Sequence, residues 1–156
     1  MKSLIRSLPL ALALVSLGTS GAEAQLYGSA GLGAAKPYGD FQDKADLGLT
    51  FRGQAGLSLW LVDAHLQTGV TTFTAADDVP EGDDGNLNIY HAGAGARLGL
   101  GFVWVGANAA YFFGDGEDGV GYFPEVGVKF WHLEAVADVR LDGDEKWWSA
   151  RIGYRF

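Results

Sequence analysis

Along most of this chain the polarity changes at every second residue, and the last ten residues show this most clearly. Side chains of a β-strand point alternately to its two faces, so a period of two separates one face from the other. From Trp147 to Phe156, one face carries Trp148, Ala150, Ile152, Tyr154 and Phe156, and the other carries Trp147, Ser149, Arg151, Gly153 and Arg155. The pattern predicts a strand with one face in an apolar medium and the other in a polar one.

The N-terminal segment, residues 1–24, is typical of a secretory signal peptide. It has a basic start at Lys2 and Arg6, an apolar run over 8–17, and a small-x-small cleavage site at 22–24. We expect its removal, which leaves residues 25–156 as one barrel domain. No later stretch approaches the roughly 20 apolar residues of a transmembrane helix, so any membrane span must be built from strands. The chain has no cysteine, which excludes disulfides and cysteine-ligated metals.

The charge and composition narrow the function classes. Without residues 1–24 the chain has nine basic and eighteen acidic residues, a formal charge of −9. This argues against nucleic acid as a partner, because phosphate contacts require clusters of Lys and Arg. The 24 glycines and 13% aromatic residues favour many short strands with tight turns.

The alternation divides into eight segments whose phase changes between neighbours. A phase change between two long runs indicates a tight reversal. We expect short turns near residues 60, 101 and 132, and longer acidic loops at 36–46, 75–86, 114–121 and 142–146. Pro124 cannot donate a backbone hydrogen bond, so we expect it at a rim or a bulge. The predicted strands are residues 26–35, 47–59, 62–74, 87–101, 102–114, 122–130, 133–141 and 147–156.

Alternation alone does not tell a barrel in lipid from a soluble barrel, which would turn its apolar face inward. The composition of the polar face favours the barrel in lipid. This face is rich in glycine, and its positive and negative charges nearly balance, as expected of an ion-pair network in a narrow lumen. Turned outward at mid-membrane, an Arg would cost about 2–4 kcal/mol. The predicted interior charges are Arg52, Arg97, Lys129, Arg140, Arg151 and Arg155 with Asp63, Glu125, Glu134 and Asp138.

Aromatic residues on the apolar face fall mostly near the predicted strand ends. Aromatic girdles at these positions are typical of transmembrane barrels, whose waist tolerates small residues. The predicted outward aromatics are Phe51, Phe73, Tyr90, Tyr111, Phe113, Tyr122, Phe130, Trp148, Tyr154 and Phe156.

With its closing strand, its eight segments and its alternating short and long links, the chain from 25 to 156 resembles the small bacterial outer-membrane proteins of the OmpA/OmpX-like class. The resemblance implies an all-β fold, an eight-stranded antiparallel up-and-down transmembrane β-barrel, with the short turns in the periplasm. It also implies outer-membrane lipid and the barrel-assembly machinery as partners. In that class the C-terminal residues, here Ile152, Tyr154 and Phe156, act as an assembly signal.

The class also contains lipid-modifying enzymes, which need a nucleophile beside a base. The inward candidates are His65 and His91 with Ser29, Ser58 and Ser149, and the chain has no His-x-Ser pair. We therefore expect no catalytic residues and no cofactor. The acidic loops contain Asp77, Asp78, Glu81, Asp83, Asp84, Asp115, Glu117 and Asp118 without EF-hand spacing, which leaves divalent cations open as partners.

The expected function is therefore a non-enzymatic outer-membrane barrel with a structural or surface-interaction role and acidic outer loops. Three alternatives remain open: a barrel that binds or passes a small solute, a lipid-modifying enzyme, and a soluble periplasmic barrel. The sequence predicts neither the ligand nor the oligomeric state.

Overall fold

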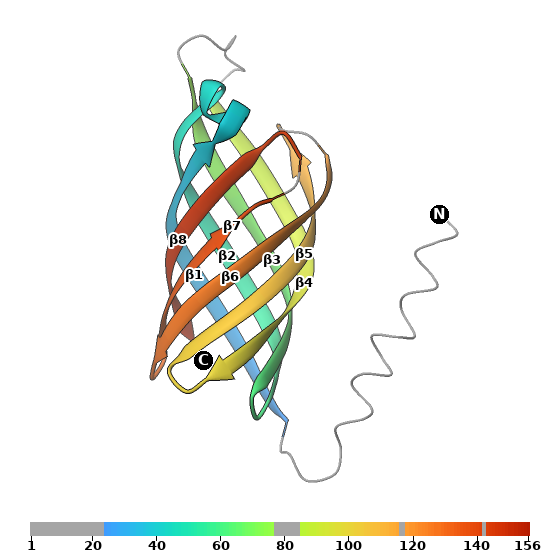
Figure 1. The fold of residues 1–156 in the computed structure, drawn as a ribbon, viewed down its shortest axis with the longest axis vertical. Helices are drawn as coiled ribbons and strands as arrows, with labels where there is room; N and C mark the ends of the chain where they lie inside the picture. The colour runs from blue at the N-terminus through green and yellow to red at the C-terminus, as the bar shows by residue number, and fades with distance from the viewer. Residues whose placement is uncertain (1–23, 77–84, 116–117, 142) are drawn as a thin grey trace, which may run out of the picture.

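The protein is a closed barrel of eight antiparallel strands in chain order, so the predicted fold is confirmed (Figure 1). This computed structural model describes residues 24–76, 85–115, 118–141 and 143–156. The predicted signal peptide lies outside the described residues, except Ala24 at its end. No helix among the described residues is long and apolar enough to cross a membrane. The elements are β1 Gln25–Tyr38, η2 Gly39–Asp43, β2 Ala45–Leu59, β3 Val62–Ala75, β4 Asn86–Leu100, β5 Val103–Gly114, β6 Gly119–Phe130, β7 Leu133–Val139 and β8 Lys146–Arg155.

The strand register gives the barrel its tilt. A row of paired residues that starts at Gln25 passes once around the barrel and returns to β1 at Ala35, ten residues further along. A stagger of this size in eight strands requires a strand tilt of about 35–45° and leaves an interior just wide enough for side chains. The residues between the two ends of the row are Ser58, Asp63, Arg97, Gly106, Glu125, Asp138 and Ser149.

The three short turns occur where the phase changes predict them, at one end of the barrel. We call this end the inner end; the longer links lie at the opposite, outer end (Figure 1). Gly101, Trp60 and Trp131 begin the three turns with positive φ, at 81°, 54° and 55°. The left-handed region suits glycine but costs other residues about 1–2 kcal/mol. Trp60 and Trp131 are 87% and 81% exposed. Two of the three turns thus carry a large exposed aromatic ring at the inner rim, although the backbone conformation there would favour glycine.

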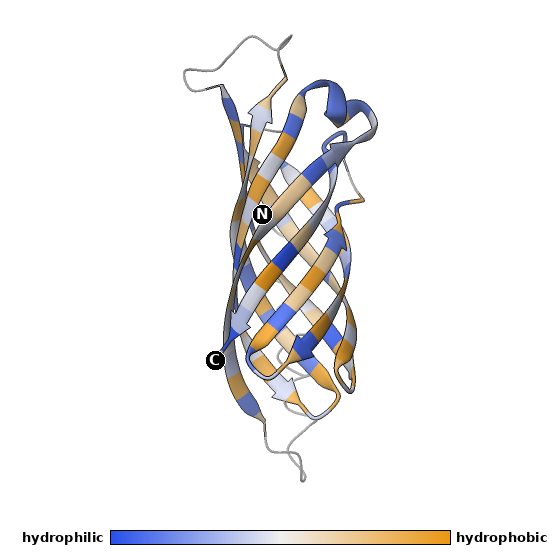
Figure 2. Cartoon of the chain, turned by 90° about the vertical axis from the view of Figure 1, so that its left-hand side faces the viewer, coloured by the Kyte–Doolittle hydropathy of each residue, from blue (hydrophilic) through white to orange (hydrophobic). Residues whose placement is uncertain are grey.

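The polarity of the barrel is inverted relative to a soluble protein. Figure 2 shows apolar and polar residues alternating along the strands nearest the viewer. Large apolar side chains such as Leu32, Leu66 and Ile152 point outward and are 61–70% exposed, whereas Arg52, Arg97 and Arg151 are buried inside. A soluble barrel would have the opposite arrangement. All of the predicted outward aromatics except Phe73 are exposed as expected.

Phe73 was wrongly predicted to face outward, because its side chain is fully buried in the lumen. It occupies an odd position in β3, like the inward residues His65 and Gln67, so the strand period itself requires this orientation.

Pro124 lies in the interior of β6, so the predicted rim or bulge position is wrong. It pairs in regular register with Ala107 of β5. On the side of β7, the last paired residues are Glu125 and Asp138, so the ladder stops just before it reaches Pro124. Beyond Pro124 the two segments are joined once more, where Leu141 N donates to Tyr122 O at 3.1 Å. Pro124 is therefore accommodated by a local gap in the ladder, where its missing donor would have been used.

We expect Pro124→Val to stabilise the barrel, because valine restores a backbone N–H that can donate to β7. The substitution should raise the free energy of unfolding by about 0.5–1.5 kcal/mol, the contribution of one hydrogen bond. Urea unfolding of the refolded barrel measures the change. Ala107→Val, at the cross-strand partner, adds apolar bulk on the same face without adding a donor. Equal stability changes in both variants would contradict the explanation.

Candidate functional site

The interior contains three layers along the barrel axis. An aromatic plug of Phe41, Phe73, Phe112, Phe123 and Trp147 lies toward the outer end, an ion-pair network occupies the waist, and a small cavity opens at the inner end. Each layer is built from inward positions of several strands, and η2 adds Phe41 to the plug.

The ion-pair network consists of three arginines and three carboxylates. Glu125 lies at its centre, with Arg97 Nε donating to Glu125 Oε1 at 2.8 Å, and with Arg52 and Arg151 at 3.6 and 3.7 Å. Asp138 is 2.6 Å from Arg151 and 3.4 Å from Arg52, and Glu134 is 3.5 Å from Arg97. All six residues are buried. The layer therefore has no net formal charge, as buried ions require.

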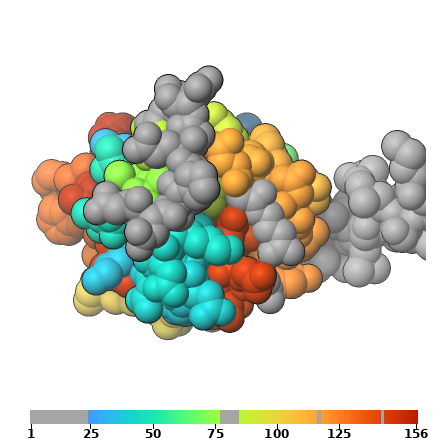
Figure 3. All heavy atoms as spheres, turned by 90° about the horizontal axis from the view of Figure 1, so that it is seen from above, coloured from blue at the N-terminus to red at the C-terminus, as the bar shows by residue number. Residues whose placement is uncertain are grey.

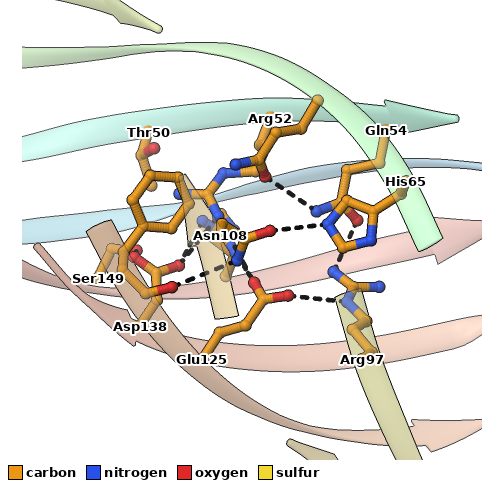
Figure 4. Close-up of polar contacts among 12 residues, drawn as sticks. Thr50, Arg52, Gln54, His65, Arg97, Asn108, Glu125, Asp138 and Ser149 are labelled. Carbon is orange, nitrogen blue, oxygen red and sulfur yellow. Dashed lines mark hydrogen bonds and ion pairs between the residues drawn. The ribbon is translucent and has the colours of Figure 1, made fainter. Parts of the chain in front are cut away.

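Neutral side chains complete this network (Figure 4). Gln54 Oε1 accepts a hydrogen bond of 2.6 Å from Arg97 Nη2 and one of 3.1 Å from Ser29 Oγ. Ser149 Oγ donates to Asp138 Oδ1 at 2.9 Å. Gln54 and Ser149 were not predicted as members of the ion-pair network, although both lie at inward positions of the predicted strands.

Two glycines make room for the large interior groups. A Cβ atom at Gly127 would overlap the indole ring of Trp104, and one at Gly106 would lie 3.0 Å from Arg97 Cγ. The Arg97 guanidinium carbon in turn lies 4.0 Å from the centroid of the Trp104 ring. Small inward residues thus allow an arginine and a tryptophan to stack across a narrow lumen.

The aromatic plug closes the lumen above the network. η2 brings Phe41 into the barrel mouth, with ring centroids 5.2 Å from Phe73 and 6.2 Å from Trp147. Viewed from above, residues of this segment, in cyan, lie over the outer end of the barrel (Figure 3). Phe112 continues the contact, 5.7 Å from Trp147 and 5.9 Å from Phe123. The sequence predicted only an acidic loop here, and Phe41 was missed.

The remaining predicted interior charges lie above and below the network. Arg140 lies 3.9 Å from the Phe112 centroid and pairs with Glu145 at 3.2 Å; Glu145 was not predicted, because it lies in an expected loop. At the inner end, Arg155 pairs with Asp63 at 2.6 Å. Lys129 also lies there and makes no ion pair with any residue that the structure describes. The ten predicted charges are thus divided among three layers.

The candidate catalytic side chains have other partners. His65 Nε2 is 2.8 Å from Asn108 Oδ1, while Ser29 and Ser149 donate to Gln54 and Asp138. The ring nitrogens of His91 make no hydrogen bond within the described chain, and its ring packs against Phe112 and Phe123. No described serine is hydrogen-bonded to a histidine, so these candidates do not form a Ser–His pair in the described part of the chain.

The predicted cation sites fall mostly outside the described residues. Asp115 is described, and its Oδ2 accepts a hydrogen bond of 2.9 Å from Asn88 N. Among the residues with described positions, no group of three or more His, Asp or Glu could hold a metal ion. Those outside are Asp77, Asp78, Glu81, Asp83, Asp84 and Glu117.

The barrel aligns with the crystal structure of Neisserial surface protein A. The TM-score is 0.53 at 19% sequence identity, and the alignment covers 87% of this chain and 98% of the other. The two proteins share a fold. Ail, the attachment invasion locus protein of Yersinia pestis, aligns at a TM-score of 0.47 and 16% identity, over 88% and 100% of the two chains. No family model matches the sequence, and no curated protein matches it. At 19% identity, the likeness to Neisserial surface protein A shows the fold alone.

Proposed function

We propose that the protein is an integral outer-membrane barrel with a closed lumen and a structural or surface-interaction role rather than an enzymatic one. The observation that carries the proposal is the inverted polarity, with exposed leucines and aromatics outside and paired charges within. Water would not cover such a surface favourably, whereas the hydrocarbon of a bilayer would.

The closed lumen supports a role at the surface over one in transport. Within the described residues, the cavity at the waist has a volume of about 10 Å³, bounded by residues such as Arg52, Gln54 and Arg97. This is about the space of one water molecule. Passage of a solute would require the ion-pair network and the aromatic plug to move together.

The closing seam supports the proposed recognition by the assembly machinery. Phe156 N donates to Gly28 O at 2.9 Å, and Gly28 N donates to Phe156 O at 2.9 Å, which joins the end of β8 to β1. The side chains of Ile152, Tyr154 and Phe156 all point outward. They are thus accessible to a protein that guides closure of the barrel from outside.

Planar-bilayer conductance tests the proposal. In cells, the protein should fractionate with outer membranes and require detergent for extraction. The purified barrel should insert into planar bilayers without stable unitary openings. An open porin inserted under the same conditions provides the positive control. Stable openings would exclude the closed lumen and favour solute passage, and recovery in the soluble periplasmic fraction would exclude the membrane location. Altered outer-leaflet acylation in a deletion strain would favour the lipid-modifying alternative.

A further inference from the structure

The inner end of the barrel contains a cavity that none of the proposed roles uses. It has a volume of about 110 Å³ and lies between the β2–β3 turn, the β4–β5 turn and the end of β8. We call it the inner vestibule; its polar and aromatic walls are formed by Ser58, Asp63, Arg97, Trp104, Lys129 and Arg155.

The vestibule holds a positive charge that the described protein does not balance. Lys129 makes no ion pair with a described residue, and its cross-strand neighbour Glu134 lies 3.5 Å from Arg97 instead. The five inward arginines, in contrast, each have a carboxylate within 4.0 Å: Arg52, Arg97, Arg140, Arg151 and Arg155. The uncompensated cation thus occurs in a chain whose formal net charge is −8.

A second cation in the vestibule is held in place. The Arg155 guanidinium carbon lies 3.7 Å from the centroid of the Tyr27 ring, and Arg155 Nη1 lies 2.6 Å from Asp63 Oδ2. Asp63 is the one carboxylate among the residues that line the described vestibule. Asp63 accepts a hydrogen bond from Nη1 of Arg155. A guanidinium has five N–H donors, so other N–H groups of Arg155 can donate to a bound anion.

We propose that the inner vestibule binds a phosphate group between Lys129 and Arg155. A lysine ammonium is a point charge with three donors, and an arginine presents a planar fork, so together they match a tetrahedral oxyanion. The Ser58 hydroxyl also lines the cavity, where it is hydrogen-bonded to Asp63. The source is either free inorganic phosphate or the headgroup of an inner-leaflet phospholipid, since the exposed Trp60 lies at the same rim.

Amide chemical shifts of the complete mature barrel, refolded in a maltoside detergent without phosphate, provide the test. Inorganic phosphate and a short-chain phosphatidylglycerol are titrated separately at constant ionic strength. We expect saturable shifts at the turns near 60 and 101 with at least one of the two. Shifts with inorganic phosphate alone assign a free solute, and shifts with the phospholipid alone assign a headgroup.

Two variants with opposite expected effects make the test specific. Lys129→Met should weaken binding about tenfold or more, because it removes a charge-assisted contact while keeping the length of the side chain. Asp63→Asn should tighten binding, because it removes the carboxylate that competes for Arg155. Lys36→Met, at an exposed lysine near the outer end of β1, is the matched control and should leave the affinity unchanged.

The proposal is overturned if neither phosphate compound gives a saturable shift, or if Lys129→Met and Lys36→Met bind phosphate equally well. Either result would leave the closed barrel intact, because conductance and fractionation are measured independently of phosphate.

Discussion

Glu125→Gln should lower the free energy of unfolding by about 3–5 kcal/mol, the cost of removing one partner from a buried ion pair. The reason is the position of Glu125 at the centre of the network, where Arg97, Arg52 and Arg151 all lie within 4.0 Å of its carboxylate. The substitution keeps the shape of the side chain but leaves three buried cations with two carboxylates. Urea unfolding of the barrel in lipid vesicles measures the loss.

A double-mutant cycle shows whether the loss comes from charge imbalance. Arg52→Gln combined with Glu125→Gln restores the balance of the layer, so the double variant should be more stable than the sum of the single effects predicts. Asp46→Asn, at an exposed carboxylate of β2, is the control and should change stability by no more than about 0.5 kcal/mol. Additive effects of the two network substitutions would contradict a coupled network.

Ala94→Arg should lower the free energy of unfolding in lipid by about 2–4 kcal/mol, because it places a charge on the outward face near the middle of β4. The same change at the strand end, Val62→Arg, should cost only about 0–1 kcal/mol, because a long arginine side chain there reaches the lipid headgroups. The measurement is urea unfolding in vesicles for both variants. Equal costs at the two depths would contradict a bilayer around the barrel.

The orientation of the strands could be predicted from the sequence because a period of two is local information. Trp104, Phe112 and Phe123 lie on the inward side, as the alternation requires. The error at Phe73 came from grouping it by residue type instead of by its position in the strand. A bulky aromatic residue indicates an apolar surrounding, and the plug supplies that surrounding inside the lumen.

The pairing of particular charges could not be predicted from the alternation alone. The register across β6 and β7, which the short turn between those strands sets, places Glu125 opposite Asp138. Arg52 and Arg151 can therefore each pair with both carboxylates. Contacts between strands that are not neighbours, such as Arg97 of β4 with Gln54 of β2, depend instead on the stagger of the whole barrel. Four long links separate the hairpins, and their lengths do not determine the stagger.

Phe41 could not be predicted because it belongs to η2, outside the regular strands, which brings it into the barrel mouth beside Trp147. Glu145 directly precedes β8 and continues the inward phase of Trp147 and Ser149, so it was missed because the predicted strand begins only at Trp147. An apolar residue within a polar link is the one local signal that could have indicated the contact of Phe41.

The seam between β1 and β8 has a consequence for the order of events during biogenesis. β1 is the first strand to emerge, yet its free edge has no partner until β8 arrives. An unpaired edge strand is a template for pairing with other chains. A chain interrupted before β8 would therefore remain an open sheet with an unpaired edge, which favours aggregation. Only a chain with all eight strands can therefore close this seam and leave no free edge.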